Sequence, residues 1–274
     1  MTDTDKNVTS DDSPKFFKIS VEIYPASNEI QEEEEHPYIQ TSFGLCFTGS
    51  YLNGSILADT IEEVLSNIQA TPLSDISIDN LSDIAFAVYK QVSRQLMQIH
   101  NEKGLTTVLL GGFCPFTTEF KLYKFAPKPI IPGQLVDFTK SEIILVNDIV
   151  FIGDSAAEIK ARQLLNNSSN QFTPFHILRD IIKDATFKTV GGNIQAGLFK
   201  ANKFKTFGII EYEVVEDENG QKQINQSFKF RNLSLNLDDN ELRKGDLNIL
   251  KTFFNPFEQE WINYFNEVID DIEQ

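Results

Sequence analysis

The chain has 274 residues, enough for one large domain or two small ones with a full hydrophobic core. It carries 24 Lys and Arg residues against 40 Asp and Glu residues, so its formal net charge is −16 at pH 7. A chain this acidic repels nucleic-acid phosphates and anionic lipid headgroups, which argues against general binding to nucleic acid or to a membrane. Its apolar stretches fall far short of the roughly 18 residues that a membrane span needs. The polar N-terminal stretch also lacks the apolar core of a signal peptide, so we expect a cytoplasmic location.

The cysteine and histidine residues indicate no metal site and no cofactor. Cys46 and Cys114 are too few for a disulfide framework or a four-ligand zinc site. Both lie in apolar runs, which predicts buried thiols in a reducing compartment. The three histidines, His36, His100 and His176, show no ligand spacing, and no phosphate-binding glycine motif is present.

The first half of the chain is predicted to combine strands with a pair of helices. Residues 1–14 are polar and are predicted to form a flexible tail. Apolar residues recur every three or four positions in two segments, which predicts helices over 56–68 and 79–100, the second capped by Asp79. β-Branched and aromatic residues predict strands over 15–24, 41–48, 106–110 and 119–125.

The second half is predicted to begin with a connection, because prolines concentrate in residues 126–140. A hairpin is expected around Asn147-Asp148, with strands over 143–146 and 149–152. The remaining elements are expected to be helices over 155–165 and 173–187, strands over 205–215 and 223–230, and a C-terminal helix with an apolar stripe from Trp261 to Ile272. Runs of strands and runs of helices, rather than strict alternation, indicate the α+β class.

One short motif carries possible hydrolase chemistry. Gly153-Asp154-Ser155 follows a predicted strand and opens a predicted helix, which resembles the nucleophile block of GDSL-type esterases. In such an enzyme Ser155 would be the nucleophile, activated by a distant histidine. The only later histidine is His176, and no aspartate stands three residues before it. The other interpretation is a glycine turn in which Asp154 or Ser155 caps the next helix.

Several segments together resemble the proteasome β-subunit family of N-terminal-nucleophile hydrolases. The helices over 56–68 and 79–100 fall where that family has its first helix pair, and Gly191-Gly192 follows a helix as its glycine pair does. The segments that carry the resemblance are Lys15–Ile19, Phe43–Ser50, Ile76–Leu81, Leu109–Pro115, Phe120–Pro127 and Phe151–Asp154. The resemblance implies a four-layer αββα sandwich over 15–215, with residues 216–274 as a C-terminal hairpin and helix packed on that domain.

The catalytic residues of the family carry over incompletely. The family's nucleophile is an N-terminal threonine whose own amine acts as the base. In this chain, Val8-Thr9-Ser10-Asp11 resembles a later part of the family's sequence. Removal of Met1 would make Thr2 the first residue, but residues 2–7 show no strand pattern, so the nucleophile has no clear counterpart. Lys15 falls where the family has a lysine that lowers the pKa of the nucleophile, and Asp154 replaces a family serine. Lys15, Asp154 and Ser155 are therefore the candidate catalytic residues.

The resemblance leads us to expect a catalytically inactive, proteasome-subunit-like protein that acts by self-assembly or by binding a protein partner. It implies a homo-oligomer held by the faces of the helices at 56–68 and 79–100. Two alternatives stay open. One is an active threonine-type peptidase with a different start or nucleophile, and the other is an esterase that uses Ser155.

Overall fold

In a computed structural model of the chain, the described residues are 14–26, 36–100, 105–131, 135–144, 149–165, 173–187, 190–191, 193–216, 222–230, 233–235 and 253–258. The described part holds four helices and several strands in a mixed arrangement, which confirms the α+β class. The chain divides into two compact units. The first unit comprises Pro14–Gly153 and Gly197–Thr206, and the second comprises the remainder.

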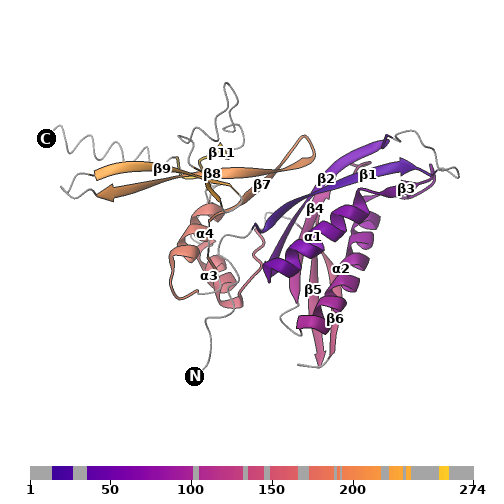
Figure 1. Cartoon of the computed structure of the whole chain (residues 1–274), viewed down its shortest axis with the longest axis horizontal. Coiled ribbons are helices and arrows are strands. Elements are labelled where there is room, and N and C mark those ends of the chain that lie inside the picture. Colours follow the sequence, from indigo (N-terminus) through magenta and orange to yellow (C-terminus); the bar gives the residue numbers. More distant parts are fainter. Residues whose placement is uncertain are drawn as a thin grey trace. The chain divides into compact units, whose positions relative to one another are not determined.

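The first unit is built on a largely antiparallel sheet. Its strands are β1 (Phe16–Pro25), β2 (Ile39–Gly49), β3 (Ile68–Ala70), β4 (Thr106–Phe113), β5 (Phe120–Ile131) and β6 (Leu135–Ile143). They are arranged in the order β3-β1-β2-β4-β5-β6, and only β3 and β1 run parallel (Figure 1). The sheet therefore has β3 and β1 toward one edge and β6 at the other.

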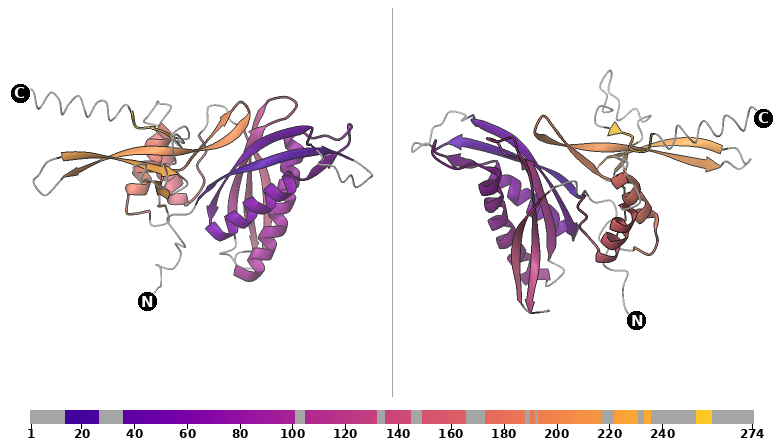
Figure 2. Two further views of the ribbon diagram at one scale, coloured as in Figure 1. Left: turned by 45° about the horizontal axis from the view of Figure 1, so that its top comes forward. Right: turned by 180° about the vertical axis from the view of Figure 1, so that it is seen from behind.

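Two helices cover one face of this sheet, as the views in Figures 1 and 2 agree. The helix α1 (Tyr51–Leu65) lies over β1 and β2, and α2 (Ile78–His100) lies over β4 and β5. Alternating strand residues meet the apolar stripes of the helices in one core. Its fully buried members include Ile19, Phe43, Leu57, Ala85, Tyr89 and Phe125. No helix in the described part of the chain has the length and apolarity to cross a bilayer.

The opposite face of the sheet carries a cluster of phenylalanines. Phe113 of β4 and Phe120 of β5 pack against Phe199 of β7 (Ala196–Lys200), with ring centroids 5.2 to 5.4 Å apart. Phe204, near the start of β8 (Lys203–Glu216), packs on Phe199 at 5.1 Å. Gly44 of β2 makes room for this ring, because a Cβ there would lie 2.5 Å from the Phe204 side chain.

The second unit contains the helices α3 (Ser155–Leu165) and α4 (Thr173–Lys183) and most of β8. β8 forms an antiparallel hairpin with β9 (Lys222–Phe230), which pairs in turn with β10 (Leu233–Leu235). The short strand β11 (Phe253–Phe254) pairs parallel with β8. A small core of Ile194, Ala196, Ile209 and Phe257 holds the unit together.

Three expectations about elements need correction. Residues 126–140 are not a connection, since β5 runs to Ile131 and β6 begins at Leu135. The first helix begins at Tyr51 rather than after Asn53-Gly54. Residues 149–152 form no strand. The C-terminal helix predicted over 261–272 lies outside the described residues.

Candidate functional site

Lys15 lies just before β1, close to the end of β2. Its ammonium group donates a hydrogen bond to the carbonyl oxygen of Gly49 at 3.2 Å. The same nitrogen lies 4.7 Å from the centroid of the Phe47 ring, which is a cation–π distance. Burial lowers the pKa of Lys15, because removing water disfavours the charged amine. These contacts tie the start of β1 to the end of β2.

Asp154 caps the N-terminus of α3. Its carboxylate oxygen Oδ1 accepts hydrogen bonds from the backbone N–H groups of Ala156 at 2.9 Å and of Ala157 at 3.3 Å. Ser155 is the first residue of α3 and is exposed. The motif thus has the geometry of a glycine turn followed by a capped helix, which is one of the two interpretations of Gly153-Asp154-Ser155.

The histidine that an esterase would need contacts a different part of the second unit. The ring of His176 on α4 lies edge-to-face on Phe257 with centroids 5.1 Å apart. Its Nδ1 atom is 3.4 Å from a guanidinium nitrogen of Arg179, which itself lies over the Phe257 ring at 4.4 Å. Among the described residues, no histidine is hydrogen-bonded to the Ser155 hydroxyl. Lys15 belongs to the first unit and Ser155 to the second.

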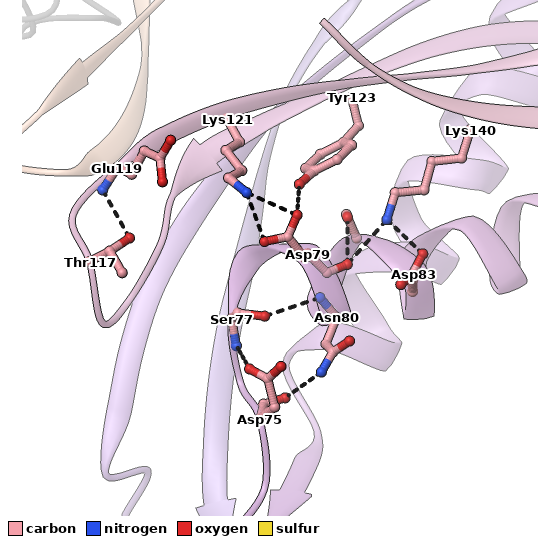
Figure 3. A network of polar contacts seen from close by, with 11 residues as sticks. Asp75, Ser77, Asp79, Asn80, Asp83, Thr117, Glu119, Lys121, Tyr123 and Lys140 are labelled. Atoms are coloured by element: carbon pink, nitrogen blue, oxygen red, sulfur yellow. Dashed lines mark hydrogen bonds and ion pairs between the residues drawn. The ribbon is translucent and has the colours of Figure 1, made fainter. Parts of the chain in front are cut away.

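The sequence did not reveal a polar network at the N-terminus of α2, shown in Figure 3. Lys121 of β5 donates to both carboxylate oxygens of Asp79, at 3.0 and 2.9 Å, and the hydroxyl of Tyr123 donates to the same carboxylate at 2.5 Å. Lys140 of β6 donates to the backbone oxygen of Asp79 at 3.1 Å and to Asp83 at 2.6 Å. The network joins the first turn of α2 to two strands.

The electrostatics of this network oppose proton transfer at neutral pH. The hydrogen bonds from Lys121 and Tyr123 hold the pKa of Asp79 below its ordinary value. Burial, and then the hydrogen bond to Asp79, raises the pKa of Tyr123. Asp79 therefore stays ionised and Tyr123 stays protonated. The network is suited to holding the first turn of α2 on the sheet rather than to transferring a proton.

Asp79 is not the capping residue that the sequence suggested. The helix begins at Ile78, and the Ser77 hydroxyl accepts the N–H of Asn80 at 3.4 Å (Figure 3). The one available signal for the real role of Asp79 was the alternation of Lys121 and Tyr123 on one face of a strand. No sequence pattern indicated a role for Lys140, because it falls in the segment 126–140, which was predicted to be a connection.

Cys114 lies beside a groove of about 200 Å³ in the first unit. Burial alone would raise the pKa of its thiol, but hydrogen bonds from the Thr117 side chain and from the backbone of Thr117, Ile78 and Phe116 outweigh it and lower the pKa. Cys46 differs, because burial raises its pKa to about 12. Both thiols are free, and within the described ranges no cluster of three or more His, Cys, Asp or Glu side chains could hold a metal ion.

The outward surfaces of α1 and α2 carry apolar side chains that no described residue covers fully. On α1, Leu52 is 54 % exposed and Ile56, one turn later, is 37 % exposed. On α2, Ile84 is 37 % exposed and Ile99 is 70 % exposed. These residues lie on the two helices whose faces were predicted from the sequence to hold a homo-oligomer together.

Comparisons with known proteins add no assignment for the chain. No protein-family model matches it, and a search of curated proteins finds no match either.

Proposed function

We propose that this chain is a catalytically inactive, proteasome-β-subunit-like protein that acts in the cytoplasm by self-assembly or by binding a protein partner. The proposal includes a four-layer αββα sandwich, in which α1, α2 and the sheet of the first unit form two adjacent layers. The resemblance in the sequence suggests the family, and the structure supplies three supporting observations.

The first supporting observation is that the sheet of the first unit has apolar residues on both faces. One face is covered by α1 and α2, and the other carries half-buried or buried apolar residues, among them Leu109, Leu122 and Phe120. A sheet that packs against a second sheet needs an apolar second face, because stacked sheets interdigitate side chains across about 10 Å. The phenylalanine cluster around Phe199 and Phe204 lies on this face, which supports its apolar character.

The second supporting observation concerns the candidate catalytic residues. Lys15 contacts a backbone carbonyl and an aromatic ring, and Asp154 caps a helix. These are structural contacts of an ordinary kind. Thr2 and Thr9 lie outside the described residues.

The observation that carries the proposed function is the exposure of Leu52 and Ile56 on adjacent turns of α1. Burying such side chains against another chain removes apolar area from water, which contributes about 25 cal/mol per Å². Neighbouring exposed apolar residues on one helix are more typical of a contact surface than a single exposed apolar residue is.

Light scattering of the purified chain tests this function directly. We expect a defined oligomer, which dissociates when Leu52→Asp and Ile56→Asp are combined. The matched control is Leu73→Asp, since Leu73 is 97 % exposed but lies between β3 and α2 rather than on either helix. An oligomer that survives the double substitution and breaks with the control would contradict the proposal.

Activity assays test the inactive character separately. We expect no turnover on peptide and ester panels and no labelling of Ser155 by a fluorophosphonate. Intact-mass analysis of the natural protein reports its first residue. Hydrolysis accompanied by a processed Thr, Ser or Cys at the N-terminus would contradict our proposal and favour the active peptidase. Labelling of Ser155 would contradict it and favour the esterase.

A further inference from the structure

The outer margin of the helix layer along α1 is acidic, and the margin along the part of α2 that follows Asp83 is basic. Because α1 lies over β1 and β2 while α2 lies over β4 and β5, one margin follows β1 and the other follows β6. The α1 sequence from 51 to 65 contains acidic residues but no Lys or Arg, whereas the α2 sequence from 84 to 100 contains Lys90 and Arg94 but no Asp or Glu.

The acidic margin includes a hollow beside β1. The carboxylate of Glu62 accepts the backbone N–H of Ser20 at 3.2 Å, which places Glu62 on the β1 side of α1. Next to it lies a hollow of about 280 Å³, lined by Phe17, Ser55, Ile56, Asp59 and Glu62. The hollow thus combines apolar walls with two carboxylates.

The basic margin holds two cations over aromatic rings. The ammonium group of Lys90 lies 5.0 Å from the centroid of the Phe86 ring. The guanidinium carbon of Arg94 lies 6.0 Å from the centroid of Phe138, a residue of β6, so Arg94 faces the opposite edge of the sheet from Asp59. These cation–π contacts orient the side chains without neutralising their charge.

Within the part of the chain that the structure describes, Asp59, Glu62, Lys90 and Arg94 form no ion pair. Each molecule therefore presents an acidic margin and a basic margin with their charges available. The Lys and Arg side chains are also complementary to the hollow. Each has an apolar stem, which suits the apolar walls, and a cationic end, which suits the carboxylates.

We propose that a second copy of this chain docks side by side on the first, with Lys90 and Arg94 of one copy against the Asp59–Glu62 hollow of the next. This inference rests on the self-assembly proposed above and names its contact. The contact is heterologous, because the two copies use different surfaces, so repetition gives a closed ring or an open filament.

The net charge of the molecule restricts how two copies can meet. At a net charge of −16, two copies repel each other at long range. They approach favourably where cations on one face carboxylates on the other, which fixes the orientation of the pair. Salt screens both the attraction at this contact and the long-range repulsion between the copies.

Charge reversal tests the contact by light scattering and sedimentation of the full chain. The first variant, Lys90→Glu with Arg94→Glu, makes both margins acidic. The second, Asp59→Lys with Glu62→Gln, makes the acidic margin basic and keeps an oxygen that accepts the Ser20 N–H. We expect each variant alone to weaken self-association by about tenfold or more, and an equal mixture of the two to restore it.

Restoration on mixing shows that the acidic margin of one copy meets the basic margin of the next, because each variant then meets the opposite charge at both margins. The matched control for the first variant is Lys18→Glu with Lys128→Glu, which makes the same change in net charge at exposed residues of β1 and β5 and should leave assembly intact. Circular dichroism checks that all variants fold. A wild-type oligomer that neither variant affects, or that mixing does not restore, overturns this inference while the assembly function stands. A wild-type chain that stays monomeric overturns both the inference and self-assembly.

Discussion

The hydroxyl of Tyr123 donates a 2.5 Å hydrogen bond to the carboxylate of Asp79, across the joint between β5 and α2 (Figure 3). Tyr123 is 2 % exposed, whereas the Asp79 side chain is 49 % exposed. The bond therefore links the buried sheet to the solvent-facing first turn of the helix. Lys121 binds the same carboxylate, so one side chain of α2 receives two donors from one strand.

Replacing Asp79 by Asn removes the charge that these two donors share. We expect Asp79→Asn to lower the free energy of unfolding by about 1 kcal/mol in urea denaturation at pH 7, a modest value because solvent screens the half-exposed carboxylate. Asp83→Asn is the control. It breaks one ion pair with Lys140 at a side chain that is 64 % exposed and should cost less than about 0.5 kcal/mol. An equal loss in both variants would contradict a special role for Asp79.

The same carboxylate predicts a pH dependence. Its pKa in the folded protein lies below the unfolded value of about 3.9. The stabilisation is therefore complete above the unfolded pKa and is lost as pH falls through the lower, folded pKa. Between about pH 5 and pH 2 the wild type should lose more stability than Asp79→Asn, and the two unfolding free energies should converge. Parallel curves over that range would refute the assignment.

Gly44 of β2 and Gly111 of β4 are paired in the sheet register. They offer a matched pair of substitutions that test the packing on the sheet face opposite α1 and α2. A Cβ at Gly44 would lie 2.5 Å from the Phe204 ring, but a Cβ at Gly111 would lie 3.0 Å from the end of the flexible Leu122 side chain. We expect Gly44→Ala to cost about 1–3 kcal/mol and Gly111→Ala clearly less, as thermal unfolding would measure. Equal costs would mean that Phe204 does not pack on Gly44.

Much of the first unit was predictable, because its period-2 and period-3.6 patterns are strong. The predicted strand 41–48 and helix 79–100 agree with β2 and α2 within two residues. The start of α1 was missed because Asn53-Gly54 is typical of a turn. In the structure Gly54 lies inside the helix, where a Cβ would lie 2.2 Å from the Phe47 ring. A glycine that permits close packing has the same sequence signature as one that permits a turn.

Prolines explain a second error in the predicted fold, the assignment of residues 126–140 to a connection. Beyond Phe125, β5 pairs only with β6, so Pro127 and Pro129 lie in a stretch with one neighbouring strand. A proline is compatible with a strand where its missing N–H would face an open edge. The site was harder to predict, since the network of Asp79, Lys121 and Lys140 joins residues 42 and 61 positions apart. Only the tertiary pairing of α2 with β5 and β6 brings them together.

Thr106 provides a test of buried polar groups. The Tyr89 hydroxyl donates to the backbone oxygen of Thr106 at 2.7 Å, and both residues are buried. The Thr106 hydroxyl itself has no hydrogen-bond partner among the described residues. We expect Tyr89→Phe to cost about 1 kcal/mol, but Thr106→Val to be neutral or stabilising, because valine keeps the shape and removes an unsatisfied group. A loss of stability in Thr106→Val, measured by chemical denaturation, would reveal a partner for that hydroxyl.

The two cysteines should differ in reactivity toward iodoacetamide, because the thiolate is the species that reacts. Hydrogen bonds from Thr117 and neighbouring backbone groups lower the pKa of Cys114, whereas burial raises that of Cys46 to about 12. We expect mass spectrometry to find that the alkylation rate of Cys114, which is 5 % exposed, rises with pH at a lower midpoint than the rate of the half-buried Cys46. Thr117→Val removes one hydrogen-bond donor and should move the midpoint of the Cys114 profile to higher pH, with Thr118→Val as the neighbouring control. If both cysteines reacted alike, or if Thr117→Val left the profile unchanged, the hydrogen bonds at Cys114 would not be what stabilises its thiolate.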